Sequence, residues 1–280
     1  MLKLASLCFP DTEKSCFYCC PPIRDPEADT LDNIEERRAA LRANRKNLQA
    51  NITRGQEISG ESCWGLGFLD DAEKQAGCLL HPLRHNGDDL RHLTGYQFKC
   101  ANALCREALI FAELNPKEQQ FCLNLCREMD SFTYSSRSNP LMRLLAWETG
   151  IVQFVIADSR RNDTPFIDRY SFIWQKLDFR LDSYLVYEIF GKAGTDFLLN
   201  RLQHFIILRK QLIAELKDLK NDPDFKNLTN TDPVPAHKLD IPLSLSRLLK
   251  FGADLWELPA ASRELILSKT EQTLEKFLHS

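Results

Sequence analysis

All ten cysteines of this 280-residue chain lie between residues 8 and 126. Within that region, residues 56–100 are rich in glycine and show no periodic apolar pattern, so apolar burial alone does not explain how they would fold. The distribution predicts two parts, a cysteine-rich metal-chelating region over residues 1–106 and an all-helical domain over residues 107–280. We expect a bound ion, rather than an apolar core, to order the first part.

The redox compartment decides how so many thiols are used. The apolar part of the N-terminal sequence MLKLASLCFPDTEK is too short for a secretory signal, which favours a cytoplasmic location. Disulfides are uncommon in that reducing compartment. A disulfide framework is therefore the less favoured interpretation of the cysteines, and metal binding the more favoured one.

Eight of the cysteines have surroundings typical of metal ligands, because they lie in turns, at expected helix starts, or beside proline and glycine. Cys16-x2-Cys19 has the short gap that lets two sulfurs turn toward one ion, and Cys100-x4-Cys105 is a looser version. Zinc takes four such ligands and an iron–sulfur cluster takes thiolates similarly, so one site or two can be built. His81 could add a nitrogen ligand. The predicted ligands are Cys8, Cys16, Cys19, Cys20, Cys63, Cys78, Cys100 and Cys105.

The other two cysteines, Cys122 and Cys126, fall within an expected helix. Their spacing places them on one face together with Leu125 and Met129. Cysteine that binds no metal behaves as a small apolar side chain. We therefore predict that these two thiols pack in the core, a metal-binding i, i+4 pair being the alternative.

The order of the cysteine motifs resembles the YkgJ family of cysteine-cluster proteins, described as putative zinc- or iron-chelating proteins. Cys16, Cys19 and Cys20 match the family's opening, Cys63 with Phe68-Leu69 its middle, and Gly77-Cys78 with Pro82 its third element; Cys100 or Cys105 would be the last cysteine. The opening has one cysteine fewer than the family pattern, a place that Cys8 would have to fill, and His81 stands where the family has arginine. The resemblance covers residues 8–106 and implies metal chelation rather than a reaction.

Helical patterns dominate the rest of the chain, so the expected class is mainly α, with an irregular cysteine-rich region packed on a helical domain. A long helix is expected at about residues 30–54, in which Ile34, Leu41 and Leu48 recur every seven residues and Gly55 marks the end. This narrow apolar stripe predicts packing on the cysteine region or another helix, a coiled coil with a partner being the alternative. Further helices are expected over residues 101–115, 117–130, 139–158, 165–192, 194–220, 242–254 and 259–278, with a polar linker over 221–240.

The charge of the chain and its motifs exclude several classes of function. The net charge is −3 without a long basic block, so nucleic acid is not an expected partner, and no apolar run is long enough to span a membrane. The motifs G-x-S-x-G, P-loop, G-x-G-x-x-G and H-E-x-x-H do not occur, and HNGDDLRH is interpreted as a solvated polar turn, with a metal or acid–base site as the alternative. Three hypotheses remain: a binding module with structural zinc, an iron–sulfur protein with a redox or modification role, and a helical adaptor whose cysteines are incidental. The first is favoured, with the metal ion as partner and a protein partner also allowed; whether the chain is an enzyme stays open.

Overall fold

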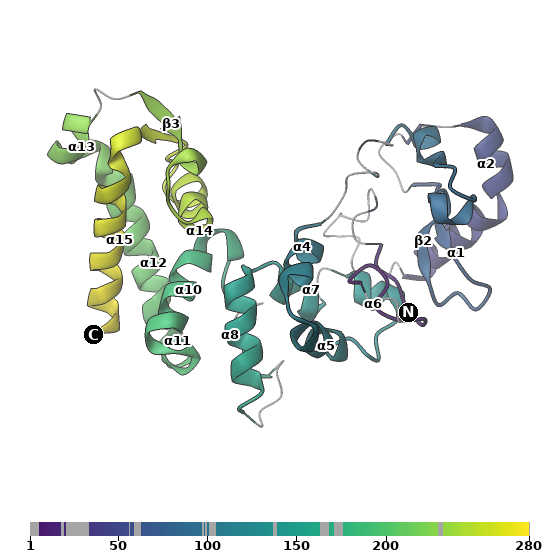
Figure 1. Ribbon diagram of the computed structural model, residues 1–280, viewed down its shortest axis with the longest axis horizontal. Coiled ribbons are helices and arrows are strands. Elements are labelled where there is room, and N and C mark those ends of the chain that lie inside the picture. The colour runs from purple at the N-terminus through teal and green to yellow at the C-terminus, as the bar shows by residue number, and fades with distance from the viewer. Residues whose placement is uncertain are drawn as a thin grey trace. The chain divides into compact units, whose positions relative to one another are not determined.

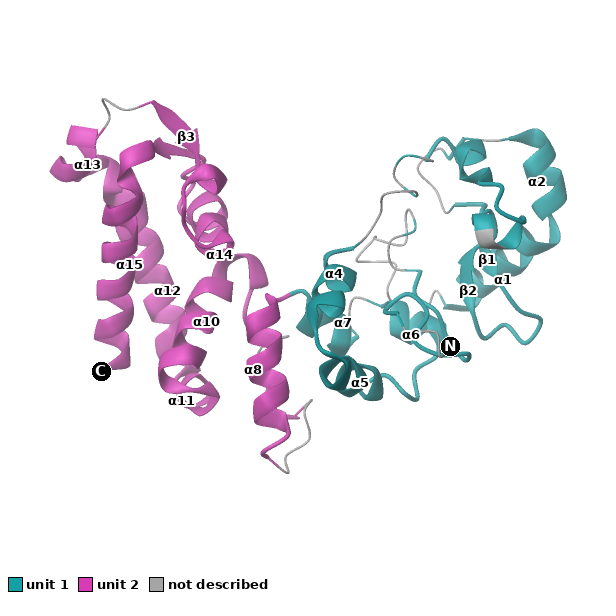
Figure 2. Ribbon diagram, viewed as in Figure 1, with its two compact units in different colours: residues 1–146 teal, residues 147–280 magenta. Residues whose placement is uncertain are grey.

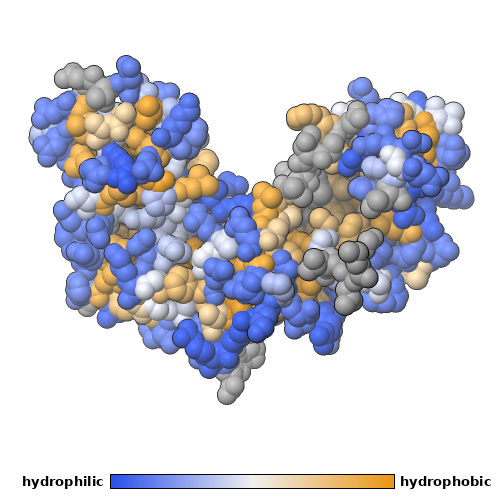
Figure 3. All heavy atoms as spheres, viewed as in Figure 1, coloured by the Kyte–Doolittle hydropathy of each residue, from blue (hydrophilic) through white to orange (hydrophobic). Residues whose placement is uncertain are grey.

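The structure is a computed structural model that describes residues 6–17, 20, 34–55, 57–58, 63–96, 98, 100, 105–136, 139–162, 168–170, 176–228 and 232–279. Within these residues the protein is mainly α-helical, as predicted, and its strands are only three residues long (Figure 1). Figure 3 shows hydrophilic residues over most of the visible face of each part of the chain. The apolar side chains that form the helices' inner faces are buried.

The chain divides into two compact units, Met1–Ala146 and Trp147–Ser280 (Figure 2). Composition places the change near residue 106, whereas in the structure the helices between Arg106 and Leu145 belong to the cysteine-rich unit. The physical reason lies in a short helix near the end of this unit, α6 (Ser131–Ser135), whose hydroxyl groups bind the N-terminal segment of the chain.

Two serine hydroxyls of α6 hold residues 6–17 in place. The Ser15 amide donates a hydrogen bond to Ser131 Oγ at 3.1 Å, and the Phe17 amide donates one to Ser135 Oγ at 3.0 Å. The Phe17 side chain is buried. Because these backbone groups are satisfied by side chains, an irregular segment can be buried without a sheet.

Lys14 fixes the same segment by charge. Its side chain is almost fully buried, with Nζ 2.5 Å from the Asp11 carboxylate and donating to the Arg127 carbonyl oxygen at 3.1 Å. A buried ammonium group without such partners would be strongly destabilising. The N-terminal segment is therefore a specific part of the first unit.

A small antiparallel hairpin lies at the centre of the cysteine region. It consists of β1 (Leu66–Phe68) and β2 (Ala76–Cys78), paired so that Leu66 lies opposite Cys78. The turn joins the other ends of the two strands, so Cys78 is at the open end of the hairpin. Opposite residues of a hairpin point to the same face of the sheet, and this face is apolar.

The expected long helix is present as two consecutive helices, α1 (Ile34–Lys46) and α2 (Leu48–Arg54), with a break at Asn47. Gly55 ends α2 in the left-handed conformation, with φ 59°, as predicted for a terminating glycine. Leu41 is the buried residue of α1 and packs on β1. The apolar stripe therefore packs on the cysteine region, which confirms the favoured interpretation.

Close contact between α1 and the hairpin requires glycine at position 67. A Cβ atom on Gly67 would lie 2.5 Å from Leu79 Cδ1 and 3.2 Å from the Leu41 carbonyl oxygen on α1. The helix backbone therefore lies almost directly on the strand. The buried apolar cluster formed there comprises Phe17, Leu41, Cys63, Leu66, Phe68, Ala76 and Phe132.

The first unit is completed by α4 (Arg106–Glu113), α5 (Pro116–Asn124) and α7 (Pro140–Leu145), of which α4 packs on α7. Asn115 and Asn139 cap α5 and α7 by accepting hydrogen bonds from backbone amides of the first turn, and a proline follows each of them. This is the arrangement expected from the sequence at Pro140, because proline in a first turn removes no helical hydrogen bond.

The second unit is a group of helices around one core (Figure 1). Its described helices are α8 (Thr149–Ser159), α10 (Phe179–Ala193), α11 (Thr195–Asn200), α12 (Leu202–Lys217), α13 (Pro223–Leu228), α14 (Leu243–Arg247) and α15 (Arg263–Leu278). A π-helical turn, Leu248–Gly252, continues α14. Helix α10 packs against α8, α11, α14 and α15, and α12 packs along α15.

Buried charges connect the elements of this unit. Asp158 on α8 accepts hydrogen bonds from Arg169 Nε at 2.7 Å and from the Tyr170 hydroxyl. Asp182 on α10 is fully buried and lies 2.8 Å from Arg209 on α12. Each carboxylate is held by a guanidinium group, as buried charges require.

Several element boundaries differ from the prediction. The helix expected over 139–158 is interrupted at Trp147, which is buried, and the expected linker 221–240 contains α13 and the strand β3 (Pro233–Pro235). β3 pairs with β4 (Glu257–Pro259), so tertiary pairing orders a segment that composition alone describes as a linker.

No single helix of the described residues is long and apolar enough to cross a membrane, although the consecutive segments Ser131–Leu145 and Thr149–Ser159 pass such a test together. Core helices of globular proteins pass the same test, and the leucines, isoleucines and valines of both segments are buried here.

Candidate metal-binding site

The hairpin positions two of the predicted ligands at its open end. Cys63 begins the turn into β1, where its carbonyl accepts from the Leu66 amide at 2.9 Å, and Leu66 lies opposite Cys78. Asn44 on α1 donates to the carbonyl oxygens of both Cys63 and Leu66, at 3.3 and 2.9 Å, which fixes this turn. Cys63 and Cys78 are thus neighbours because of strand register, although fifteen positions separate them in the sequence.

A third cysteine, Cys100, is held by an arginine through its backbone carbonyl. Arg91 Nη1 donates to the Cys100 carbonyl oxygen at 2.8 Å, while Asp89 holds the other side of the guanidinium group at 2.7 and 2.8 Å. The Leu90 amide donates to the Leu80 carbonyl at 3.3 Å, which joins this segment to the residues just after β2. Arg91 and Asp89 are therefore structural neighbours of the cysteines.

The electrostatics of Cys78 reflect these neighbours. Burial raises the pKa of the Cys78 thiol to about 11, with Cys63 and Cys100 adding to the rise and Arg91 opposing it. Burial also lowers the pKa of the half-buried His81, with the charge of Arg91 acting in the same direction. Metal binding at Cys78 would release a proton, because the ligand is the thiolate.

Cys8 and Cys16 form a second pair near α6. The Cys16 amide donates to the Cys8 carbonyl oxygen at 2.9 Å, and the Tyr134 hydroxyl donates to the Leu7 carbonyl oxygen at 2.7 Å. Burial raises the pKa of Tyr134, and the nearby Cys16 and Cys8 thiols contribute to the rise. These two cysteines therefore lie around a buried tyrosine.

The remaining predicted ligands are placed separately. Cys20, whose amide donates to the Phe17 carbonyl at 3.0 Å, packs against the apolar cluster that contains Cys63. Cys105 immediately precedes α4, and its carbonyl accepts from that helix's first turn. Cys19 lies outside the described residues.

The donor chemistry fits zinc or an iron–sulfur cluster, because several half-buried thiols lie within one unit and no disulfide joins any two of the nine cysteines described. The geometry is less complete. Among the described residues, no three cysteine, histidine or acidic side chains are placed to hold one ion. The eight predicted ligands therefore stay a prediction.

Both histidines of the polar turn HNGDDLRH bind backbone carbonyl oxygens. His85 Nε2 lies 2.7 Å from the Leu79 carbonyl oxygen, and His92 Nδ1 lies 2.8 Å from the Asp89 carbonyl oxygen. Asp89 also caps the following 3₁₀ helix by accepting from the Arg91 amide. The sequence did not reveal that Arg91 binds the Cys100 carbonyl. In the sequence, Asp89 and Arg91 look like an ordinary local ion pair between residues two positions apart.

Cys122 and Cys126 are core residues, as predicted. Their exposed fractions are 0 % and 1 %, and Cys126 Sγ lies 3.7 Å from Asn139 Oδ1. Burial raises the pKa of the Cys126 thiol to about 11. The helix α5 ends at Asn124, so Cys126 lies in the turn that follows rather than on a continuous helical face.

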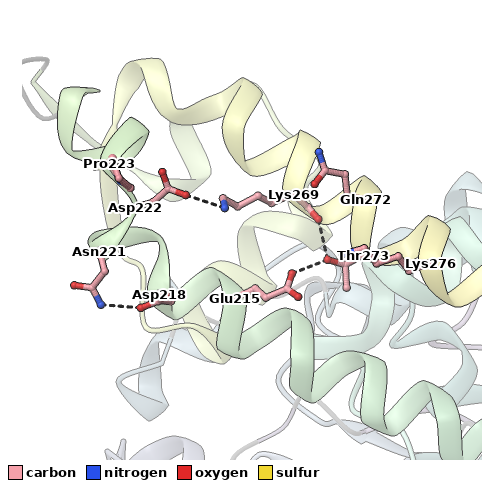
Figure 4. A pocket seen from close by; sticks show the side chains of 9 residues that line it. All are labelled: Glu215, Asp218, Asn221, Asp222, Pro223, Lys269, Gln272, Thr273 and Lys276. Carbon is pink, nitrogen blue, oxygen red and sulfur yellow. Dashed lines mark hydrogen bonds and ion pairs between the residues drawn. The ribbon is translucent and has the colours of Figure 1, made fainter.

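The second unit has a polar cavity of about 440 Å³ between α15 and the end of α12 (Figure 4). Several of its polar side chains bond to one another: Lys269 Nζ lies 2.8 Å from Asp222, and the Thr273 hydroxyl donates to Glu215 at 2.7 Å. These pairs join α15 to α12 and to the segment that follows it, so the polar side chains around the cavity hold the helices together.

Comparisons of the chain with protein-family models, with curated proteins and with solved structures returned no match.

Proposed function

We propose that the first unit is a metal-binding module that chelates zinc through cysteine thiolates, with an iron–sulfur cluster as the alternative. The proposed ligands are the eight cysteines predicted from the sequence. The metal would be structural, and the protein would act by binding rather than by catalysing a reaction. The resemblance to the YkgJ family belongs to this proposal, and its middle and third motifs correspond to the two strands of the hairpin.

The observation that carries the proposal is the grouping of Cys63, Cys78 and Cys100 beside Arg91. The cysteines come from three segments of the chain, and the nearby Cys63 and Cys100 add to the rise that burial causes in the pKa of Cys78. A guanidinium group among thiols lowers the cost of making them thiolates.

The energetics support the same conclusion. The hairpin has only three residues in each strand, and the apolar cluster that covers it is small. Structural zinc contributes roughly 10–16 kcal/mol in small metal-folded peptides at neutral pH, a large amount compared with such a core.

The direct test is elemental analysis and an absorption spectrum of the full chain purified without air. Colourless protein with about one or two zinc ions per chain supports the zinc proposal, since each tetrahedral site takes four ligands. A brown protein with thiolate-to-iron absorption supports the iron–sulfur alternative instead.

Two variants separate both metal proposals from a helical adaptor with incidental cysteines. Cys19→Ser and Cys78→Ser, made separately, are expected to lower metal content or to destabilise the protein markedly. Metal-free wild-type protein that stays fully folded, together with unchanged stability in both variants, would support the adaptor and contradict metal binding.

A further inference from the structure

We infer that Cys8 and Cys16 are a redox modification site, a pair of thiols that a hydroperoxide converts into one reversible disulfide. This inference goes beyond the proposed function, because the reaction needs no metal. The two states exclude each other at these positions, since a metal ligand is a thiolate and a disulfide would withdraw two of the eight proposed ligands.

The backbone places the two cysteines within reach of a disulfide. The Cys16 amide donates a hydrogen bond to the Cys8 carbonyl oxygen at 2.9 Å. The standard bond lengths on either side of this hydrogen bond keep the two Cα atoms within about 7 Å of each other. Disulfides join cysteines whose Cα atoms are roughly 4.4 to 6.8 Å apart. A bridge between these residues therefore needs little movement of the backbone.

The side chains of the pair lie near one buried group. Burial raises the pKa of the Tyr134 hydroxyl, and the Cys16 and Cys8 thiols add to the rise. This hydroxyl donates to the Leu7 carbonyl oxygen at 2.7 Å, next to Cys8 in the chain. Rotation about each cysteine χ1, among three staggered positions, is then the movement that brings the two sulfurs into contact.

Neighbouring residues hold both cysteines in place. Leu7, just before Cys8, is buried and accepts the hydrogen bond from the tyrosine hydroxyl. Cys16 stands between Ser15 and Phe17, whose amides donate to the two serine hydroxyls of α6. Because these residues are ordered before any oxidation, little further conformational entropy is lost when the sulfurs are joined.

Accessibility separates this pair from a third thiol near the same tyrosine. Cys8 and Cys16 are half-buried, so a small hydroperoxide can reach them. Cys126 is 1 % exposed, and its sulfur lies 3.7 Å from Asn139 Oδ1. Burial also raises the pKa of the Cys126 thiol to about 11, which keeps it in the less reactive protonated form. We therefore expect Cys126 to take no part in the bridge.

The reaction balances with hydrogen peroxide as the oxidant. The peroxide transfers one oxygen atom to one thiol, which becomes a sulfenic acid, and leaves as water. The second sulfur then attacks the first, so that the S–S bond forms while the S–O bond breaks, and another water carries away the hydroxyl group and the thiol proton. The two sulfurs together lose two electrons, which the peroxide takes up, and a dithiol reductant reverses the step.

The test is disulfide mapping of the wild-type full chain, purified without air and then treated with hydrogen peroxide. The oxidation is run with and without a chelator, because zinc bound at these thiols would protect them. Remaining thiols are alkylated, and the unreduced protein is digested with trypsin and chymotrypsin. Cleavage after Phe17 and Tyr18 separates Cys16 from Cys19 and Cys20, so mass spectrometry identifies the partner without any substitution.

The expected product is a peptide pair that links Cys8 to Cys16 in at least one of the two samples and that dithiothreitol separates. Linkage of Cys8 mainly to another cysteine, or no linkage of Cys8 in either sample, would overturn the inference. Zinc bound by the reduced protein without this link would leave the proposed function standing. The link in a chain that binds no zinc would overturn the proposed function alone.

Oxidation of the chain unfolded in urea controls for closeness in the sequence. Cys19 and Cys20 lie 11 and 12 positions from Cys8, little farther than Cys16 at 8 positions. The entropy of closing a loop depends weakly on its length, so the unfolded chain should link Cys8 to all three. The same distribution of links in native and unfolded protein would show that the fold does not select the pair.

Two variants test the pairing by a second route. Cys16→Ser should leave Cys8 as an alkylated thiol after oxidation, whereas Cys20→Ser should retain the link. Cys20 is a matched control because it lies four positions further along the same segment and packs against the apolar cluster. Loss of the link in Cys20→Ser, or its equal loss in both variants, would contradict the assignment.

Discussion

The fully buried Asp182 makes the stability of the second unit depend on pH in an unusual direction. Burial raises the pKa of this carboxyl from its ordinary value of 3.8 to about 6, although Arg209 lowers it. One oxygen, Oδ2, accepts from Arg209 Nη1 and from the Asp178 amide, both at 2.8 Å. The other, Oδ1, is buried without a hydrogen-bond partner among the described residues. The charged form is therefore only partly compensated.

The sign of the effect follows from linkage. Because the folded-state pKa exceeds the unfolded-state value, the folded protein takes up a proton first as the pH falls from about 6 toward 3.8, and folding becomes more favourable in that window. A difference of about two pKa units corresponds to roughly 3 kcal/mol, at about 1.4 kcal/mol for each unit. Above pH 6 this contribution is absent.

We expect Asp182→Asn to abolish this dependence. The Asn oxygen can accept the two hydrogen bonds of Oδ2, while its amide group takes the unpartnered place, at a cost of about 1–3 kcal/mol for a buried donor left unsatisfied. The unfolding free energy of the wild type minus that of the variant should then rise by roughly 2 kcal/mol between pH 7 and pH 4, and reach the full value only below the unfolded-state pKa.

The assay is urea denaturation of the full chain followed by circular dichroism at several pH values. The exposed Asp224→Asn, on the surface of the same unit, provides the matched control. A wild-type minus Asp182→Asn difference that is flat from pH 7 to pH 4, or that falls, would refute the argument.

Three further results are expected. Gly67→Ala should destabilise the first unit by about 1–3 kcal/mol in urea denaturation, because its Cβ would lie 2.5 Å from Leu79 Cδ1. The control Gly191→Ala should not destabilise the protein, because its Cβ would meet nothing closer than 3.9 Å. Equal effects of the two substitutions would contradict the packing argument. Tyr170→Phe should cost about 1–3 kcal/mol because it removes a buried hydrogen bond to Asp158, and an unchanged denaturation midpoint would contradict this. Chelator added to zinc-loaded protein should lower the unfolding temperature, whereas an unchanged temperature would count against structural metal.

Local signals in the sequence predicted much of the helical content. Gly55 ends α2, and Pro140 starts α7, because each acts through its own backbone conformation. The break at Trp147 and the short helix α6 carry no such marker. Their formation depends on which side chains are buried or hydrogen-bonded after the chain has folded.

In the candidate site, too, local signals were readable from the sequence and tertiary contacts were not. Residue types and spacings could nominate thiols as ligands, but the pairing of Leu66 with Cys78 is a matter of strand register, which the sequence does not display. The contact between Arg91 and the Cys100 carbonyl likewise depends on tertiary structure. The pairing of β3, in the expected linker, with β4 joins strands more than twenty residues apart, so no local pattern could reveal it.

The hydrogen bonds from Ser15 to Ser131 and from Phe17 to Ser135 have a consequence for how the protein assembles. They close loops of 116 and 118 residues, and closure of such loops is entropically costly until many contacts form together. During synthesis the N-terminal segment must therefore wait for α6 to leave the ribosome before it can dock. A fragment cut at residue 106 would lack its docking partner and expose apolar side chains such as Phe17, whereas a fragment ending at Ala146 would retain it.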